Sequence, residues 1–245
     1  MTPSKLTFGQ GNAKLNKKGL ITFSLPAGYT CPGARECLAR ADIEKGTIVD
    51  GPEAKFRCFA ASQEATYSSV RKSRWHNFDL LQAANKSGGV AAMIELINAS
   101  LPSNFDTVRV HVSGDFFSID YFKAWLTVAE EHPDKMFYAY TKSVHLWKEL
   151  QDIVPVNFLL TASYGGKYDD LIEENNFISA TVVFHPEEAG DKPIDHDDSH
   201  AYSPENRTDF ALLLHGVQKA GSEASTAIKR LNKEGVKTGY NKNKK

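Results

Sequence analysis

The sequence predicts a single α/β domain of about six βα units, arranged as a parallel barrel or partial barrel of the TIM type. Short apolar segments with the composition of β-strands alternate with longer segments whose apolar residues recur at helical spacing. Polar and reactive residues follow almost every predicted strand, whereas the opposite strand ends carry few. Because the carboxyl ends of parallel strands meet at one edge of a sheet, we expect these residues to share one mouth.

Six strands and six helices make up this prediction. Ser62 is the candidate cap of the first helix, and Pro102 and Pro133 end the next two. The strands are expected at Gly19–Ser24, Val108–Val112, Met136–Tyr140, Asn157–Ala162, Ile178–Phe184 and Phe210–Leu214. The helices are expected at Ser62–Asn85, Val90–Leu101, Ile119–Glu131, Val144–Ile153, Tyr168–Glu174 and Ser222–Glu234. An open doubly wound sheet is the alternative, but no G-x-G-x-x-G motif follows the first strand, which counts against its dinucleotide-binding form.

The composition is that of an ordinary globular chain, with 245 residues, 41% hydrophobic residues and a formal net charge of -1. We expect one domain, 1–245, with a cysteine-bearing loop at 26–61 and an acidic insertion at 186–209. No apolar run approaches the ~18 residues of a membrane span, and the N-terminal residues lack the apolar core of a signal peptide. Three cysteines, an odd number, argue against a secreted disulfide framework, so we expect a cytoplasmic protein without membrane association.

The cysteine-bearing loop is the candidate metal site. Cys31, Cys37 and Cys58 are separated by five and then twenty residues, in a stretch rich in glycine and proline. Three thiolates can bind Zn²⁺ together with a histidine, or a [4Fe–4S] cluster with one open iron. The spacing matches no standard zinc finger or ribbon, and three ordinary reduced thiols are the alternative. The predicted cofactor is zinc or an iron–sulfur cluster, and the sequence does not choose between them.

A carboxylate follows the second predicted strand at Asp115, directly after Ser113 and Gly114. A carboxylate at such a position can serve as a nucleophile, a general base or a ligand anchor. Its alternative role is a helix cap, but Ser118 is the better-placed cap for the helix that follows. Asp115 is therefore a candidate catalytic residue, and Ser113 and Gly114 are candidates for substrate binding.

Further candidates for substrate binding stand at the same strand ends. Lys142 can bind phosphate as a point charge, and Ser163 with the glycines after it can hold an anion through backbone amides. Phe116 and Phe117 can stack on a base, although adjacent aromatic residues often divide between core and rim. The remaining candidates are Tyr140, Tyr164 and His185.

A basic patch near the cysteine loop is the candidate nucleic-acid interface. Arg71 and Arg74 are three residues apart and share a helix face, and Arg57 precedes them. A solvated helix face is the alternative. Residues 1–18 and the last ten residues each hold four lysines and no acid, which suits contact with phosphates or a solvated terminus.

Four blocks of sequence resemble the phage-encoded gene product 88 family: FSLPAGYTCPGARECLAR, FRCFAASQEATYSSVRKSRWHNF, VRVHVSGDFFSIDYFKAW and FYAYTKS. The resemblance extends over residues 5–230. It implies a phage protein in the cytoplasm of its host, and it suggests two enzyme classes.

The first class is the tRNA-guanine transglycosylase type, a pentosyltransferase whose phage relatives exchange guanine in DNA for a 7-deazaguanine. This resemblance implies Asp115 as nucleophile or base, Asp169 or Asp170 as a second carboxylate and Phe116 in the base pocket. Lys142 is a further catalytic candidate and, with the arginines, a candidate phosphate contact. The implied partners are DNA or RNA and a free purine or 7-deazapurine base, and the target base leaves the helical stack. Base exchange in DNA is the leading expectation, although that class has eight strands and a late zinc site.

The second class is the radical S-adenosylmethionine partial barrel, which is similar in its six βα units, its cysteine loop after strand one and a Gly-acid motif, here Ser113-Gly114-Asp115. That class spaces its cysteines more tightly, and Cys58 has to fold back over the first strand to join the other two. A third hypothesis is a nucleic-acid-binding module with a structural zinc and no catalysis.

Overall fold

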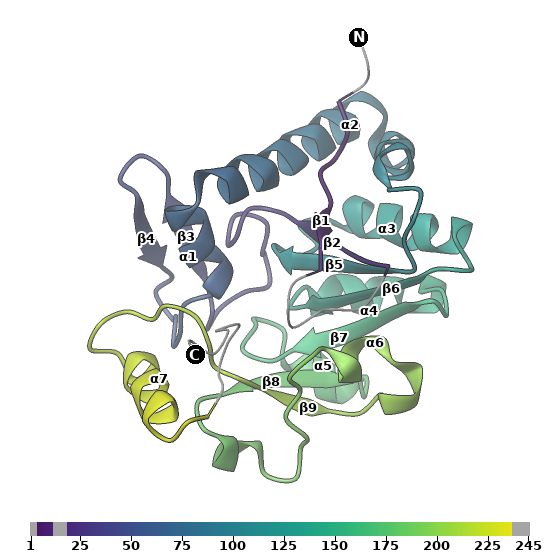
Figure 1. Ribbon diagram of the computed structural model, residues 1–245. Coiled ribbons are helices and arrows are strands. Elements are labelled where there is room, and N and C mark those ends of the chain that lie inside the picture. Colours follow the sequence, from purple (N-terminus) through teal and green to yellow (C-terminus); the bar gives the residue numbers. More distant parts are fainter. Residues whose placement is uncertain (1–3, 12–18, 237–245) are drawn as a thin grey trace.

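The structure, a computed structural model, describes residues 4–11 and 19–236 as a mixed α/β domain (Figure 1). Its main sheet has seven strands in the order β1-β2-β5-β6-β7-β8-β9. β1 pairs antiparallel with β2, and every other neighbouring pair is parallel. The strands are β1 (Gly9–Gln10), β2 (Leu20–Ser24), β5 (Thr107–Ser113), β6 (Met136–Thr141), β7 (Phe158–Ser163), β8 (Ser179–Val183) and β9 (Phe210–Leu213), and a separate hairpin holds β3 (Ala39–Asp42) and β4 (Thr47–Asp50).

The parallel strands β2 and β5 to β9 lie side by side in chain order, which confirms the predicted α/β class with a parallel sheet (Figure 1). This order lacks the reversal that defines a doubly wound sheet. β9 lies at one edge of the sheet, and β2 pairs with β1 and β5. The strands of the described residues therefore form no closed barrel. The closed TIM-type barrel, one of the two predicted forms, is not observed among them.

The helices agree with the prediction except near the cysteine loop and in the acidic insertion, where the structure adds a short helix at Ser199–Tyr202. The segment expected to be one helix at Ser62–Asn85 is divided at Tyr67, and the second part runs on to Ser100 across a non-helical break at Gly88 and Gly89. The helices are α1 (Phe59–Thr66), α2 (Ser68–Ser100), α3 (Ile119–Glu131), α4 (Val144–Leu150), α5 (Asp170–Glu174), α6 (Ser199–Tyr202) and α7 (Glu223–Lys233), with 3-10 turns at Gln151–Ile153, Pro186–Ala189 and Pro204–Asn206. None of the described helices is both long and apolar enough to cross a membrane.

The main hydrophobic core lies between one face of the sheet and helices α2 to α5. Successive side chains of a strand point to opposite faces, and Phe23, Val110 and Phe137 belong to the face that points into this core. They pack with Trp125 of α3 and Trp147 of α4. Because interiors are close-packed, this layer fixes where each strand ends.

The insertion 186–209 covers part of the other face of the sheet, where Tyr138 packs against α6. Asp198, which directly precedes α6, accepts a hydrogen bond from Arg109 of β5 at 2.6 Å and one from the Tyr138 hydroxyl at 3.0 Å. Asp195 and Asp198 are only 3% and 4% exposed. The acidic insertion is therefore buried against the rest of the domain at these two residues. Most lysines of the predicted basic termini lie in 1–3, 12–18 and 237–245, outside the described residues.

β5 contains a buried histidine with an unusual backbone conformation. His111 has a φ of 71°, in the left-handed region that non-glycine residues rarely adopt, where the β2–β5 register shifts. Its side chain is buried, and Nε2 lies 2.8 Å from the hydroxyl of Tyr121. Burial lowers the pKa of His111 to about 3, so the ring is neutral in the folded protein.

We expect this histidine to weaken the fold in mild acid. In the unfolded chain the ring binds its proton near pH 6.5, while the folded chain excludes it down to about pH 3. The contribution of His111 to the free energy of unfolding is therefore fully present above pH 6.5. It falls by about 1.4 kcal/mol per pH unit between pH 6.5 and about pH 3. Urea unfolding at pH 7 and pH 5 should show that His111→Asn loses about 2 kcal/mol less than the wild type over this interval. An equal loss in both proteins would contradict the assignment.

Candidate functional site

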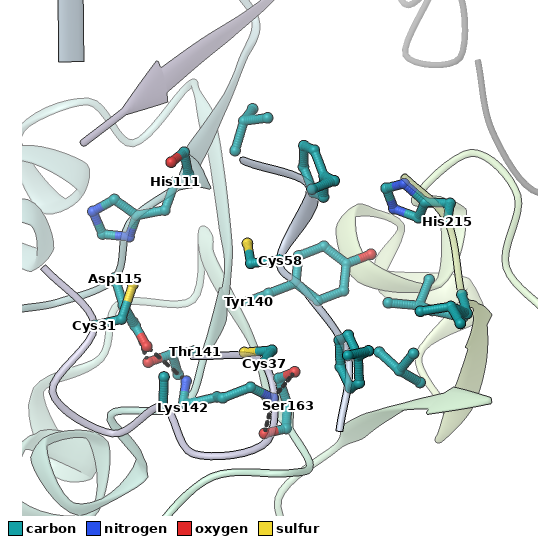
Figure 2. Close-up of a pocket in the computed structure, with 18 of the residues that line it drawn as sticks. Cys31, Cys37, Cys58, His111, Asp115, Tyr140, Thr141, Lys142, Ser163 and His215 are labelled. Atoms are coloured by element: carbon teal, nitrogen blue, oxygen red, sulfur yellow. Dashed lines mark hydrogen bonds between the residues drawn. The ribbon is translucent and has the colours of Figure 1, made fainter. Parts of the chain in front are cut away.

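One pocket of about 690 Å³ lies at the carboxyl ends of the parallel strands. It collects predicted site residues from the loops after β2, β5, β6 and β7 (Figure 2). Those that line it are Cys31, Cys37, Arg57, Cys58, Ser113, Gly114, Asp115, Tyr140, Lys142 and Ser163. These residues share one mouth, as the direction of the strands predicts.

All three cysteines are free, and each is partly buried. Burial raises the pKa of all three thiols, and that of Cys58 reaches about 11. Asp115 and the two neighbouring thiols raise the pKa of Cys31 further. The thiols are therefore protonated near neutral pH, and metal binding to them releases protons. Within residues 4–11 and 19–236, no three His, Cys, Asp or Glu side chains stand close enough together to hold a single metal ion.

Cys31 and Cys37 lie in a loop that is seated on the ends of β6 and β7. Gly33 approaches β6 so closely that a Cβ there would lie 2.0 Å from the carbonyl oxygen of Lys142. The Gly33 carbonyl accepts a hydrogen bond from the Lys167 amide, and the Glu36 amide donates to the Gly165 carbonyl, both at 2.9 Å. A side chain at position 33 would displace the loop from the strand ends.

Cys58 returns to this pocket because the chain after Cys37 turns back on itself. The hairpin of β3 and β4 forms the outward part of this excursion. Where the chain returns, the amides of Lys55 and Phe56 both donate to the carbonyl oxygen of Glu36, at 2.8 and 3.2 Å. The twenty intervening residues therefore bring the third thiol back beside the second.

A buried ion pair fixes α1 to the start of the cysteine loop. Glu64 accepts a hydrogen bond from the Ala27 amide at 2.7 Å and another from Arg74 at 2.9 Å. Arg74 also donates to the Ala60 carbonyl at 2.8 Å. Arg74 is 4% exposed, so the prediction that it contacts nucleic-acid phosphates is wrong. The side chain instead joins α1 to α2.

Asp115 is a buried carboxylate that ties the end of β5 to the end of β6. Its Oδ1 accepts hydrogen bonds from the Phe116 amide at 2.7 Å and the Thr141 hydroxyl at 2.6 Å. Its Oδ2 accepts one from the Lys142 amide at 2.8 Å. Burial raises the pKa of Asp115, and these hydrogen bonds oppose the rise. Ser118 caps α3, as predicted.

Lys142 performs the same function between β6 and β7. Its ammonium donates to the Ser163 carbonyl at 3.0 Å, to the Ser163 hydroxyl at 2.8 Å and to the Tyr164 carbonyl. A lysine ammonium has three donors, so these contacts use all of them. The prediction that Lys142 contacts phosphate finds no support in this geometry.

Phe116, Phe117 and Tyr164, three of the aromatic candidates, lie outside the pocket lining, whereas Tyr140 is part of it. Phe116 is fully buried in the core and stacks on Phe122 with ring centroids 3.7 Å apart, so its predicted role as a base-stacking platform is wrong. Phe117 stacks on Tyr121 at 4.4 Å.

Two further candidates lie outside the pocket lining. Asp169 accepts hydrogen bonds from the amides of Gly165 and Gly166, both at 2.9 Å, so the glycine turn predicted to cradle an anion is already occupied by this side chain. His185 lies 2.8 Å from Glu234, which connects the insertion to the end of α7. Both residues have structural contacts in place of the predicted site contacts.

The remaining arginines of the predicted basic patch are engaged within the protein. Arg57 forms a two-pronged ion pair with Asp50, at 2.7 and 2.8 Å. Arg71 donates to the carbonyl oxygen of Glu64 at 2.7 Å. The patch therefore offers less to a phosphate backbone than its sequence indicates.

The pocket also contains Arg109 and Asp198, which sequence reasoning missed. The Arg109 guanidinium lies 5.2 Å from the ring centre of Tyr140, whose hydroxyl is 3.3 Å from Asp198. The alternation of Arg109 with Val108 and Val110 could have placed it opposite the core. Asp198 carries no such signal, because the acidic insertion has no periodicity.

Fold and site together define a parallel α/β protein with a thiol-lined pocket at its strand ends. The chain belongs to the Gene product 88 family, whose model matches residues 4–233. Gene 88 proteins of Mycobacterium phages L5 and D29 are each 28% identical over 138 residues, which cover 54% of this chain and 51% and 50% of theirs. The chain thus spans about half the length of the curated relatives it matches. No solved structure matches.

We expect Glu64→Ala to destabilise the fold strongly, because it leaves Arg74 charged and buried without its partner. Breaking a buried ion pair costs about 3–5 kcal/mol. Lys55→Ala is the control, since the Lys55 side chain is 66% exposed and its ion pair with Glu36 should contribute no more than about 1 kcal/mol. Chemical unfolding measures the loss of stability in each variant. Equal losses would contradict the stabilising role of the Glu64–Arg74 ion pair.

Proposed function

We propose that this chain is an iron–sulfur enzyme of the radical S-adenosylmethionine type. The observation that carries the proposal is the combination of a partial barrel with its thiols. Strands β2 and β5 to β9 run parallel in chain order, and Cys31, Cys37 and Cys58 line one pocket at their carboxyl ends. The Ser113-Gly114-Asp115 turn lines the same pocket.

The three thiols fit a [4Fe–4S] cluster better than a single ion. Each cysteine of such a cluster binds a different iron, so the sulfurs need not converge on one point, and three ligands leave one iron open. Cys31, Cys37 and Cys58 would hold such a cluster, which would supply an electron for the reductive cleavage of S-adenosylmethionine.

The wide cysteine spacing, which counts against this class in the sequence, has a physical explanation. The hairpin of β3 and β4 accounts for most of the residues between Cys37 and Cys58, and the Glu36 carbonyl closes the excursion. The chain thus brings Cys58 back to the pocket without passing through the core. The wide spacing is therefore compatible with a shared cluster.

The residues of this chain hold the rim rigid around such a cluster. Gly114, at φ +85°, lies so close to the cysteine loop that a Cβ would be 2.6 Å from Leu25 and from Thr30. The Ser113 hydroxyl donates to the Leu25 carbonyl at 2.8 Å. With Asp115 fixing β6, the turn after β5 orients whatever binds beside the thiols.

Base exchange, the leading expectation from sequence, receives less support. Asp115 is 4% exposed and accepts three hydrogen bonds, which use three of about four lone-pair sites of its carboxylate and leave it little freedom to attack a sugar. Asp169 and Phe116 lie outside the pocket lining. A zinc-containing binding module also receives less support, because no group of three ligands among the described residues fits one ion.

Anaerobic reconstitution with iron and sulfide should give a brown protein that absorbs near ~400 nm and holds about four irons per chain. Cys31→Ser, Cys37→Ser and Cys58→Ser should each lose most of this iron. Leu212→Val changes an aliphatic residue of the same pocket and should load like the wild type. Iron and sulfide analysis measures the result, and a colourless wild type with one zinc or no metal would refute the proposal.

The loaded protein, reduced with dithionite, should convert S-adenosylmethionine to methionine and 5′-deoxyadenosine, measured by liquid chromatography and mass spectrometry. In Asp115→Asn an amide NH₂ replaces one accepting oxygen and faces the donors of Phe116, Thr141 or Lys142. We therefore expect the ends of β5 and β6 to shift relative to each other. The variant should retain iron and lose roughly ten- to a hundred-fold in rate. A loaded wild type that leaves S-adenosylmethionine intact would exclude this class.

A further inference from the structure

We propose that Gln218, in the loop after β9, is a positioning residue that holds Cys58 in the thiol pocket. The Gln218 side chain both accepts a hydrogen bond from the backbone of the residue before Cys58 and donates one to it. The Arg57 amide donates to Gln218 Oε1 at 2.8 Å, and Gln218 Nε2 donates back to the Arg57 carbonyl at 3.2 Å. The importance of this contact for a metal ligand rests on the proposed function.

Gln218 is itself fixed to the end of the sheet. Its Nε2 also donates to the carbonyl oxygen of His215 at 3.1 Å, just beyond β9. The amide group therefore works as a bridge with one end on the last strand and the other on the residue before Cys58. Both of its polar atoms are engaged in this bridge.

The same loop also contacts the residue after Cys58. A Cβ at Gly216, where φ is +85°, would lie 2.8 Å from the Cβ of Phe59, so the two backbones meet closely. The His215 ring lies 4.7 Å from the Phe59 ring. Residues 215–218 thus contact the chain on both sides of Cys58.

This contact matters because Cys58 is positioned by a different part of the sheet from Cys31 and Cys37. The loop with Cys31 and Cys37 is seated on β6 and β7 through Gly33 and Glu36. Residues 57–59 instead meet the loop after β9, which is separated from β2 by the whole width of the parallel series. The position of the third thiol therefore depends on this loop contact as well as on the two hydrogen bonds to the Glu36 carbonyl.

The test compares Gln218→Ala with the wild type in the metal-free protein, using iodoacetamide and peptide mass spectrometry to read each thiol. Loss of the bridge should speed alkylation of Cys58 about three- to ten-fold, because local opening becomes easier. Cys31 and Cys37 should react at wild-type rates. Lys219→Ala, an exposed neighbour, is the matched control and should leave all three rates unchanged.

An unchanged rate at Cys58 would overturn the proposal, and so would an equal rise at all three thiols, which would mean general loosening. In reconstituted protein, Gln218→Ala should release iron to a chelator faster than the wild type by a similar factor. If the wild type binds no iron, the proposed function fails, while the alkylation rates still decide the role of Gln218.

Discussion

The pocket depends on one reversal of the chain, the return from β4 to the carbonyl oxygen of Glu36. That oxygen accepts two amide hydrogen bonds and so fixes the third cysteine segment beside the first two thiols. Each such bond contributes only about 0.5–1.5 kcal/mol, so the reversal needs further support. The buried pair of Glu64 and Arg74 supplies it by joining α1 to the amide of Ala27 at the end of β2.

The charged groups of the rim are used to hold strand ends together. Asp115 joins β5 to β6, Lys142 joins β6 to β7, and Arg109 of β5 is paired with Asp198 of the insertion. Burying a charge is costly unless it is paired or hydrogen-bonded, and each of these groups meets that condition. The result is a stiff rim around three thiols, in which Lys142 and Arg109 are already engaged within the protein.

Periodicity predicted the parallel strands and most helices, because alternation and helical spacing are local signals of burial. Strand direction also predicted that Cys31, Asp115, Lys142 and His185 share a mouth; the first three do, and His185 lies outside the pocket lining. Periodicity could not predict the hairpin after Cys37, since Ala39–Asp42 has little β propensity and forms a strand only through its pairing with Thr47–Asp50. Nor could it assign Lys142 and Phe116, because a polar or aromatic residue at a strand end has the same sequence signal whether it faces the pocket or braces the fold.

The open edge of the sheet explains why the last strand matters to a site built mainly after the first. Were β9 paired with β2, a ladder of backbone hydrogen bonds would set the width of the mouth. Here β9 is an edge strand, and the contact between residues 57–59 and 215–218 joins its end to the cysteine segment instead. Contacts of a few side chains open at lower free energy than a ladder. All of these residues lie within the family match, 4–233, so this contact belongs to the part of the chain that defines its membership of the family.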